Sequence, residues 1–93
     1  MKTNKYFRLE VVGKEVGYIN KTSSTLLVTT NPYIVWSLWF GFESVDVYEV
    51  EGAIVTDNTC NYEDEDGVVF KVEDYVVVVS SIKKVGTMKM DMS

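Results

Sequence analysis

The chain has 93 residues, and its nine basic and fourteen acidic side chains give a net charge of −5 at neutral pH. This length fits a single domain, residues 1–93, with one modest hydrophobic core. Valine, isoleucine, threonine and the aromatic residues fill 41 of the 93 positions, and since these residues favour strands, the composition excludes a helical bundle, a coiled coil and a wholly disordered chain.

The first predicted strand covers residues 5–12, where apolar and charged side chains alternate as in a half-buried strand. Three apolar residues fall on one face and two charged residues on the other: Phe7, Leu9 and Val11 against Arg8 and Glu10. Gly13 and Lys14 suit a tight hairpin turn, so we expect residues 15–20 to return as the partner strand. Residues 25–30 are rich in β-branched side chains and are typical of a third strand.

Residues 32–40 fit either a helix or a strand. Asn31 is a good N-cap, Pro32 is a good first helical residue, and Gly41 is a natural stop. The segment between them is apolar all round. As a helix it would be buried or would expose an aromatic face, and as a strand it would be buried on both faces. The boundary signals favour the short helix.

Residues 44–50 are the next predicted strand, because valine alternates with more polar residues there. We expect Glu51 and Gly52 to turn the chain into a short returning strand over residues 53–56. Residues 57–67 are polar and acidic, which is typical of a loop.

The last third of the chain is rich in valine. We expect residues 68–72 and 75–82 to form a hairpin around a turn at residues 73–74. The four consecutive valines at 76–79 have no polar face, so this strand should be central in its sheet or covered on both faces. The tail, residues 83–93, alternates methionine with charged residues near its end, which fits a frayed end or a strand that docks on a partner.

Together these elements predict an all-β fold, or a β-dominated α+β fold, of six or seven short antiparallel strands. At most one short helix is expected, over about residues 32–40. A small barrel or a sandwich would each protect the strand edges, and the pattern does not choose between them.

Several kinds of chemistry need residues that this chain lacks. Histidine is absent, so neither a Ser-His-Asp nor a Cys-His arrangement can be built within it. Cys60 is the only cysteine, which excludes an internal disulfide and a Cys₄ zinc site and indicates a reducing, cytoplasmic compartment. The acidic run before Gly67 matches part of a calcium-binding loop, but the first ligand position is Tyr62, which has no carboxylate. We therefore expect no enzymatic activity, no metal and no cofactor.

Charge is unevenly distributed along the chain. Residues 1–42 carry five basic and two acidic side chains, whereas residues 43–93 carry four basic and twelve acidic ones. Such an acidic half repels nucleic acid and attracts basic partners. The candidate partner-binding carboxylates form two groups, the first on a predicted strand and the second in a predicted loop: Glu43, Asp46, Glu49 and Glu51, and Glu63, Asp64, Glu65 and Asp66. The alternative is that these charges only keep a valine-rich domain soluble.

Aromatic residues in and after the predicted helix are the second candidate contact surface. Trp36, Trp39 and Phe42 would act as anchors beside the acidic face, because exposed aromatic side chains mark protein contact sites. Six tyrosines and two tryptophans exceed what so small a core readily accommodates. The alternative is that these three residues belong to the core.

The sequence therefore predicts a protein that binds a basic partner stoichiometrically, such as a nucleic-acid-handling protein whose groove it occupies. Small acidic inhibitors from phages and mobile elements act in this way, an analogy that rests on size and charge alone. The alternative is a structural subunit of a larger assembly such as a virion, and a homo-oligomer is compatible with both. We expect no direct nucleic-acid binding and no membrane association, because the uncharged stretch at residues 22–42 has a polar first half.

Overall fold

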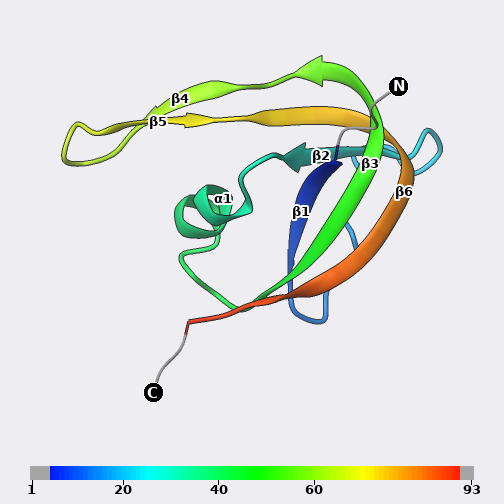
Figure 1. The fold of residues 1–93 in the computed structure, drawn as a ribbon, viewed down its shortest axis with the longest axis horizontal. Coiled ribbons are helices and arrows are strands. Elements are labelled where there is room, and N and C mark those ends of the chain that lie inside the picture. The colour runs from blue at the N-terminus through cyan, green and yellow to red at the C-terminus, as the bar shows by residue number, and fades with distance from the viewer. Residues whose placement is uncertain (1–4, 91–93) are drawn as a thin grey trace.

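The computed structural model describes residues 5–90, and antiparallel strands dominate its architecture (Figure 1). The elements in chain order are β1 (Lys5–Val11), β2 (Thr25–Thr29), α1 (Pro32–Trp39), β3 (Val45–Asp57), β4 (Cys60–Glu63), β5 (Val69–Val72) and β6 (Asp74–Met88). The predicted β-dominated fold with one short helix at residues 32–40 is confirmed. The strands number six within this range, but β3 and β6 have 13 and 15 residues and are not short.

Four of these strands close into a barrel in the order β1-β2-β6-β3, which decides between the barrel and the sandwich. Each neighbouring pair is antiparallel. β1 and β2 are in register at a single position, Phe7 opposite Thr29, so this junction is the least paired part of the wall. Arg8 reinforces it, because its Nη1 donates to the carbonyl oxygen of Leu27 over 3.1 Å.

The two long strands bend strongly around the barrel, as the green and orange ribbons of Figure 1 show. Their register shifts at three places, between Val47 and Tyr48, between Glu51 and Gly52, and between Ile54 and Thr56 of β3. Such bulges insert an unpaired residue and bend the strand. Because of this bending, β3 and β6 can pair with each other along most of their length while β1 and β2 close the remaining sides.

The predicted turn at Glu51 and Gly52 is wrong, and residues 53–56 are not a separate strand. β3 runs without interruption through both positions. The glycine is required for a different reason, since a Cβ atom at residue 52 would collide with the carbonyl of Val78 on the neighbouring strand. Gly52 therefore permits a close approach of two backbones at a bulge.

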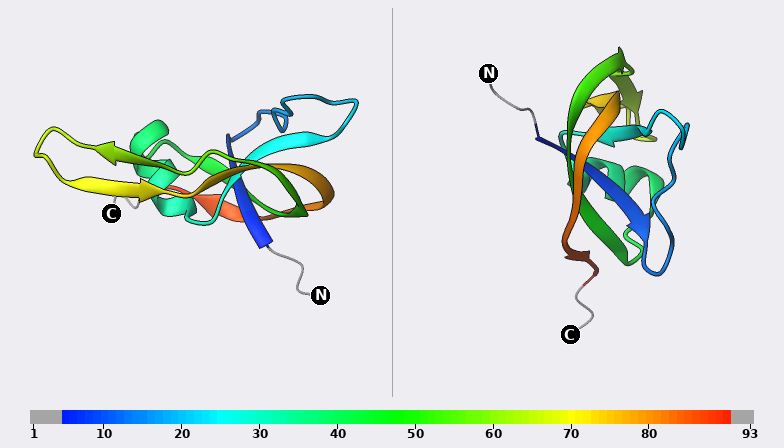
Figure 2. Two further views of the ribbon diagram at one scale, coloured as in Figure 1. Left: turned by 90° about the horizontal axis from the view of Figure 1, so that it is seen from above. Right: turned by 90° about the vertical axis from the view of Figure 1, so that its right-hand side faces the viewer.

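Two further predictions are wrong. One is the loop at residues 57–67, and the other is the hairpin between residues 68–72 and 75–82. β4 lies inside the predicted loop and pairs with β5, from Cys60 opposite Val72 to Glu63 opposite Val69. β6 turns away to pair with β2 and β3. We call residues 60–72 the arm, because this two-stranded sheet extends beyond the barrel in Figure 1 and in the left view of Figure 2.

The predicted returning strand at residues 15–20 is replaced by an irregular segment. It makes one isolated bridge, Asn20 to Thr25, and the amide of Gly17 donates to Glu10 Oε2 over 2.7 Å. The physical reason is that β1 already has β3 along one edge and meets β2 on the other. On that second edge β2 and the Arg8–Leu27 hydrogen bond take the first part, and the segment at Gly17 meets the rest of β1 through the Glu10 side chain instead of through a backbone ladder.

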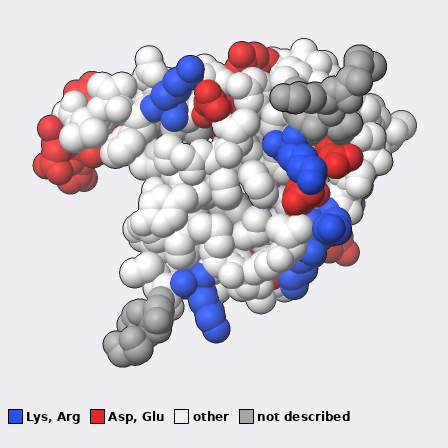
Figure 3. All heavy atoms as spheres, viewed as in Figure 1, with Lys and Arg blue, Asp and Glu red and all other residues white. Residues whose placement is uncertain are grey.

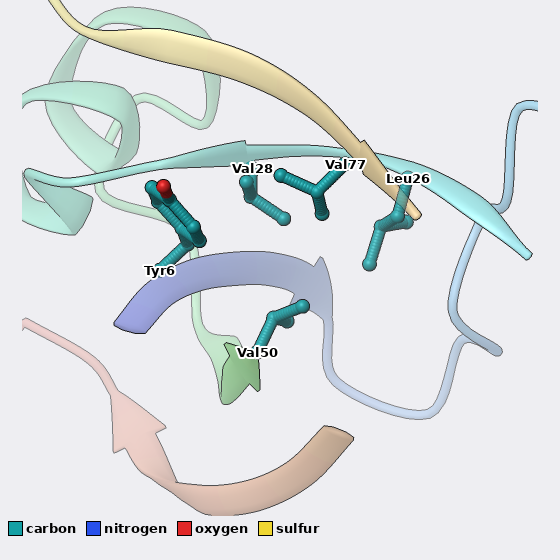
Figure 4. Close-up of a cluster of buried hydrophobic side chains, with 5 residues drawn as sticks. All are labelled: Tyr6, Leu26, Val28, Val50 and Val77. Atoms are coloured by element: carbon teal, nitrogen blue, oxygen red, sulfur yellow. The ribbon is translucent and has the colours of Figure 1, made fainter. Parts of the chain in front are cut away.

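Apolar side chains form two clusters, one on each side of the barrel wall. The inner cluster fills the barrel and has five buried members, drawn in Figure 4: Tyr6, Leu26, Val28, Val50 and Val77. The outer cluster lies between the wall and α1, and its buried members are Leu9, Trp36, Val45 and Val47. Alternate residues of a strand point to opposite faces, so β1 and β3 contribute to both clusters, and α1 covers the outer side of the wall.

The valine run is central in the sheet, as predicted, because β6 lies between β2 and β3. The alternative expectation, that the valine run is covered on both faces, is wrong. Val77 is fully buried in the inner cluster, whereas Val78 on the opposite face is 41% exposed. The helix packs over β1 and β3, so the outer face of this part of β6 stays open.

β6 continues as far as Met88, whose side chain packs against the outer cluster. The remainder of the predicted tail includes residues 91–93, which lie outside the described residues. No helix within residues 5–90 is long and apolar enough to cross a membrane.

Candidate functional site

The position of α1 is fixed by its two ends. The Asn31 side chain accepts a hydrogen bond from the amide of Ile34, and Pro32 occupies the first turn. Gly41 has a φ of +55°, the left-handed conformation that ends a helix and favours glycine. These three signals, all visible in the sequence, set where α1 begins and ends, and packing of Trp36 against Leu9 holds it on the outer face of β1.

Of the three predicted aromatic anchors, only Trp39 is accessible. Trp36 is 6% exposed and its Nε1 donates to the carbonyl of Glu43 over 2.6 Å, so it belongs to the core. Phe42 is half-buried and packs edge-on against Trp36, with ring centroids 5.0 Å apart. Both side chains pack in the outer cluster, which is the core role that the sequence left as the alternative, and anchoring of a partner by either of them stays a prediction. Trp39, about one helical turn further along α1, is 54% exposed.

Beside Trp39 lies an apolar groove between α1 and the junction of β1 and β2. Its volume is about 310 Å³. Apolar walls come from all three elements: Val35, Trp39 and Phe40 of α1, Phe7 and Leu9 of β1, and Leu27 and Val28 of β2. Two charged residues, Arg8 and Asp74, also line it.

The two charges in the groove differ in how they are compensated. Arg8 is neutralised, since its Nε lies 2.9 Å from Glu10 Oε2, and Nη1 is held by the carbonyl of Leu27. Asp74 has no lysine or arginine within salt-bridge distance among the described residues. Its burial raises the pKa of its carboxyl group above the ordinary value, and a hydrogen bond from Thr29 opposes this rise. Asp74 is therefore a partly buried carboxylate that lacks a cation.

The second group of predicted carboxylates sits at the tip of the arm, the red cluster at the left of Figure 3. Asp64 is half-buried and shapes the turn, because its Oδ1 accepts hydrogen bonds of 2.9 Å from the amides of Asp66 and Val68. Glu63, Glu65 and Asp66 are exposed. No basic side chain of residues 5–90 forms a salt bridge with them. Three of the four predicted carboxylates thus form an uncompensated acidic tip.

The first group, Glu43, Asp46, Glu49 and Glu51, does not form the exposed strand face that the sequence predicted. Asp46 points into the end of the barrel, is 5% exposed, and accepts hydrogen bonds from Lys84 and Thr87. Glu49 points to the outer side and forms an ion pair with Lys5 over 3.3 Å. Strand alternation is correct, but closure of the barrel buries the face on which Asp46 lies.

The arm and the groove are parts of one surface. The rings of Trp39 on α1 and Tyr62 on β4 lie 6.1 Å apart. Asp74 is the first residue of β6 and lies two residues after the arm. In Figure 3 the arm overhangs an uncharged, white surface. Sequence reasoning named Trp39 and the tip but missed Asp74, because an acidic residue between two strands is typical of an ordinary turn.

Comparison with known proteins adds no functional assignment. No family model matches the chain, and neither a curated protein nor a solved structure matches it. Among the described residues, no group of three or more His, Cys, Asp or Glu side chains is placed to hold a metal ion. This surface presents exposed carboxylates, exposed aromatic rings and an apolar groove.

Proposed function

We propose that this protein is a non-enzymatic binding module that uses its arm to engage a basic partner protein. The observation that carries the proposal is the acidic tip, Glu63, Glu65 and Asp66, which extends from the barrel and forms no salt bridge with a basic side chain of residues 5–90. Uncompensated carboxylates at the end of an arm concentrate negative potential where a partner first approaches. A basic protein is the partner that this potential attracts.

The arm also carries apolar surface that a partner could bury. Tyr62, Val68 and Val69 are exposed near its tip, and Trp39 is exposed beside it. Charge steers an encounter and gives specificity, whereas buried aromatic and aliphatic side chains supply most of the affinity. A nucleic acid would meet repulsion at the tip and would gain nothing from counterion release. We therefore favour a protein partner, and a protein that normally binds phosphates would have the complementary charge.

Inhibition of a nucleic-acid-handling protein is the specific form of this proposal. Exposed carboxylates on a narrow two-stranded arm could enter a basic groove that normally holds a phosphate backbone. A reducing, cytoplasmic compartment is part of the same proposal and rests on the free, exposed Cys60.

Two variants with matched charge test the proposal. Glu65→Gln with Asp66→Asn removes two charges from the tip and spares Asp64, which the turn needs. Glu15→Gln with Glu43→Gln removes two exposed charges away from the arm. Each protein serves as bait in the native cell extract, and the captured basic proteins are quantified by mass spectrometry at low and high salt. We expect the tip variant alone to lose a salt-sensitive partner, and identical captures by all three baits would contradict the proposal.

A structural subunit of a larger assembly is the second candidate, and exposed apolar residues on the barrel favour it. Ile54 and Val55 of β3 and Val78 of β6 are each more than two-fifths exposed. Apolar patches on a surface mark contact sites between proteins. Sedimentation of the purified protein distinguishes the two candidates. An assembly subunit would self-associate with increasing concentration through Val55 and Val78. The tip variant would then self-associate as the wild type does.

A further inference from the structure

We propose that the groove beside Trp39 receives a single lysine or arginine side chain of the basic partner, with the cation at Asp74 and the aliphatic stem along the apolar walls. This inference rests on the proposed function and names how the partner is held. It concerns a place on the surface that is distinct from the acidic tip.

The size and lining of the groove suit a side chain of this kind. At about 310 Å³ it lies at the lower end of the range for ligand pockets, roughly 300–1,000 Å³. Long basic side chains bury their methylene stems on apolar surface and place only the head group in a polar site. Val35 and Phe40 on one side and Leu27 on the other provide this apolar surface.

Charge favours a cation over every other occupant. Arg8 is already bound to Glu10 and to the wall of the barrel, so Asp74 is the uncompensated charge of the groove. Burial makes its ionised form unfavourable in the free protein, and an entering cation would relieve this cost. A neutral apolar ligand would bury the carboxylate further without a partner, and an anion would be repelled. The face of an aromatic ring also attracts cations, and both Trp39 and Phe40 line the groove.

Continuity with the arm identifies the source of the cation as the partner protein. Trp39 lines the groove and contacts Tyr62 of the arm. Asp74 lies two residues after the end of β5, at the base of the arm. A basic protein that binds the acidic tip therefore lies over the mouth of the groove and can insert one of its own side chains.

Blocked amino acids test the inference without the partner. N-acetyl-arginine amide and N-acetyl-citrulline amide have nearly the same shape, but only the first carries a charge. Each is titrated at neutral pH into the ¹⁵N-labelled protein, and the indole signal of Trp39 and the amide signal of Asp74 are followed. We expect the arginine probe to shift both signals and to bind about tenfold or more tightly than the citrulline probe, as a charge-assisted hydrogen bond would give.

Two variants and a third probe complete the experiment. Asp74→Asn should abolish the preference for arginine, and Asp66→Asn at the tip should retain it. Equal binding of the two probes, no shift of Trp39 with either, or an unchanged preference in Asp74→Asn would each overturn the inference. Tighter binding of N-acetyl-agmatine, which keeps the head group and the single charge but lacks the arginine backbone, would also overturn it, since the occupant would then be a small molecule.

These outcomes separate this inference from the proposed function. Loss of partner capture in the tip variant, together with no arginine preference in the groove, would leave the proposed function standing and remove only the groove as a contact. An arginine preference at Asp74, together with identical capture by all baits, would keep the groove as a cation site and remove the acidic tip as the contact with a partner.

Discussion

Glu10 and Asp46 lie directly opposite each other across β1 and β3, and both carboxylates are almost completely buried, with exposed fractions of 9% and 5%. Like charges in this position normally destabilise a sheet. Each is held by its own cation, Arg8 for Glu10 at 2.9 Å and Lys84 for Asp46 at 3.2 Å. Asp46 thus links β3 to β6, and Glu10 links β1 to the segment at Gly17, both at one end of the barrel.

Asp46 should make folding sensitive to acid. Although burial favours its neutral form, hydrogen bonds from Lys84 and Thr87 hold the pKa of its carboxyl group below the ordinary value of 3.8. A depressed pKa in the folded state adds stability above the unfolded value, and this stability is lost as pH falls through the folded pKa. Asp46→Asn should therefore lower Tm at pH 7 and flatten the decline of stability below about pH 4. Urea unfolding between pH 2 and 7 measures this, and an unchanged acid slope would contradict it.

The ionised carboxylate of Asp74 should lower the stability of the folded protein at neutral pH, whereas that of Asp46 raises it. Its burial raises the pKa of its carboxyl group, against the hydrogen bond from Thr29. A raised carboxyl pKa means that folding becomes less favourable as pH rises from the unfolded toward the folded value. Asp74→Asn should consequently raise Tm at pH 7, and the difference from the wild type should vanish in acid. Thermal unfolding followed by circular dichroism at several pH values checks this, and a lower Tm at pH 7 would show that the carboxylate supports the fold.

Gly52 should not tolerate alanine, whereas Gly86 on the paired strand should. A Cβ atom at residue 52 would meet the Val78 carbonyl, and one at residue 86 would have nothing within 4 Å. Overpacking of this kind costs about 1–3 kcal/mol. We expect Gly52→Ala to lower the free energy of unfolding by about this amount, and Gly86→Ala to change it by only a few tenths of a kcal/mol. Urea titration of both variants is the measurement, and equal midpoints would argue against the close approach at the bulge.

The two central valines of β6 should respond differently to a charge. Val77 is buried in the inner cluster, and Val78 is exposed on the outer face. An unpaired carboxylate in the core costs several kcal/mol, which is comparable with the stability of a small domain. Val77→Asp should be unfolded or insoluble, and Val78→Asp should fold with nearly the wild-type Tm. Loss of structure in Val78→Asp would mean that the outer face of β6 is covered.

Fluorescence should distinguish the two tryptophans. In Trp39→Phe the remaining Trp36 should emit at short wavelength and resist quenching by iodide, because it is buried. In Trp36→Phe the remaining Trp39 should be readily quenched. The second variant also leaves the Glu43 carbonyl without its donor, which costs about 1–3 kcal/mol if the group stays dry. Similar quenching of both variants would contradict the assigned positions.

Local signals in the sequence predicted those elements whose limits are set locally. Asn31, Pro32 and Gly41 define α1 from its own ends, and alternation defines the extent of β1. The fold class followed from composition in the same way. These features depend on the backbone conformation of a few neighbouring residues, which the side chains of those residues determine.

Pairing and burial could not be predicted in this way, because they depend on residues far apart in the chain. Gly52 looks like a turn residue until Val78 is placed against it. Alternation put Asp46 on the face opposite Val45, but only closure of the barrel shows that this face is inside. Asp74 became a candidate binding residue because α1 and β1 lie over it, a proximity that no local pattern contains.

The position of β6 between β2 and β3 has a consequence for biosynthesis. β6 follows both of its neighbours in the chain, so a nascent polypeptide that ends before it leaves one edge of each neighbour unprotected. Ribosomes add about 5–20 residues per second, and the 15 residues of β6 therefore take on the order of one to three seconds to appear. Closure of the barrel must wait for this interval, during which the unpaired edges of β2 and β3 are exposed to ribosome-associated chaperones. We expect the nascent chain to acquire its protease resistance late and in a single step, once β6 has emerged.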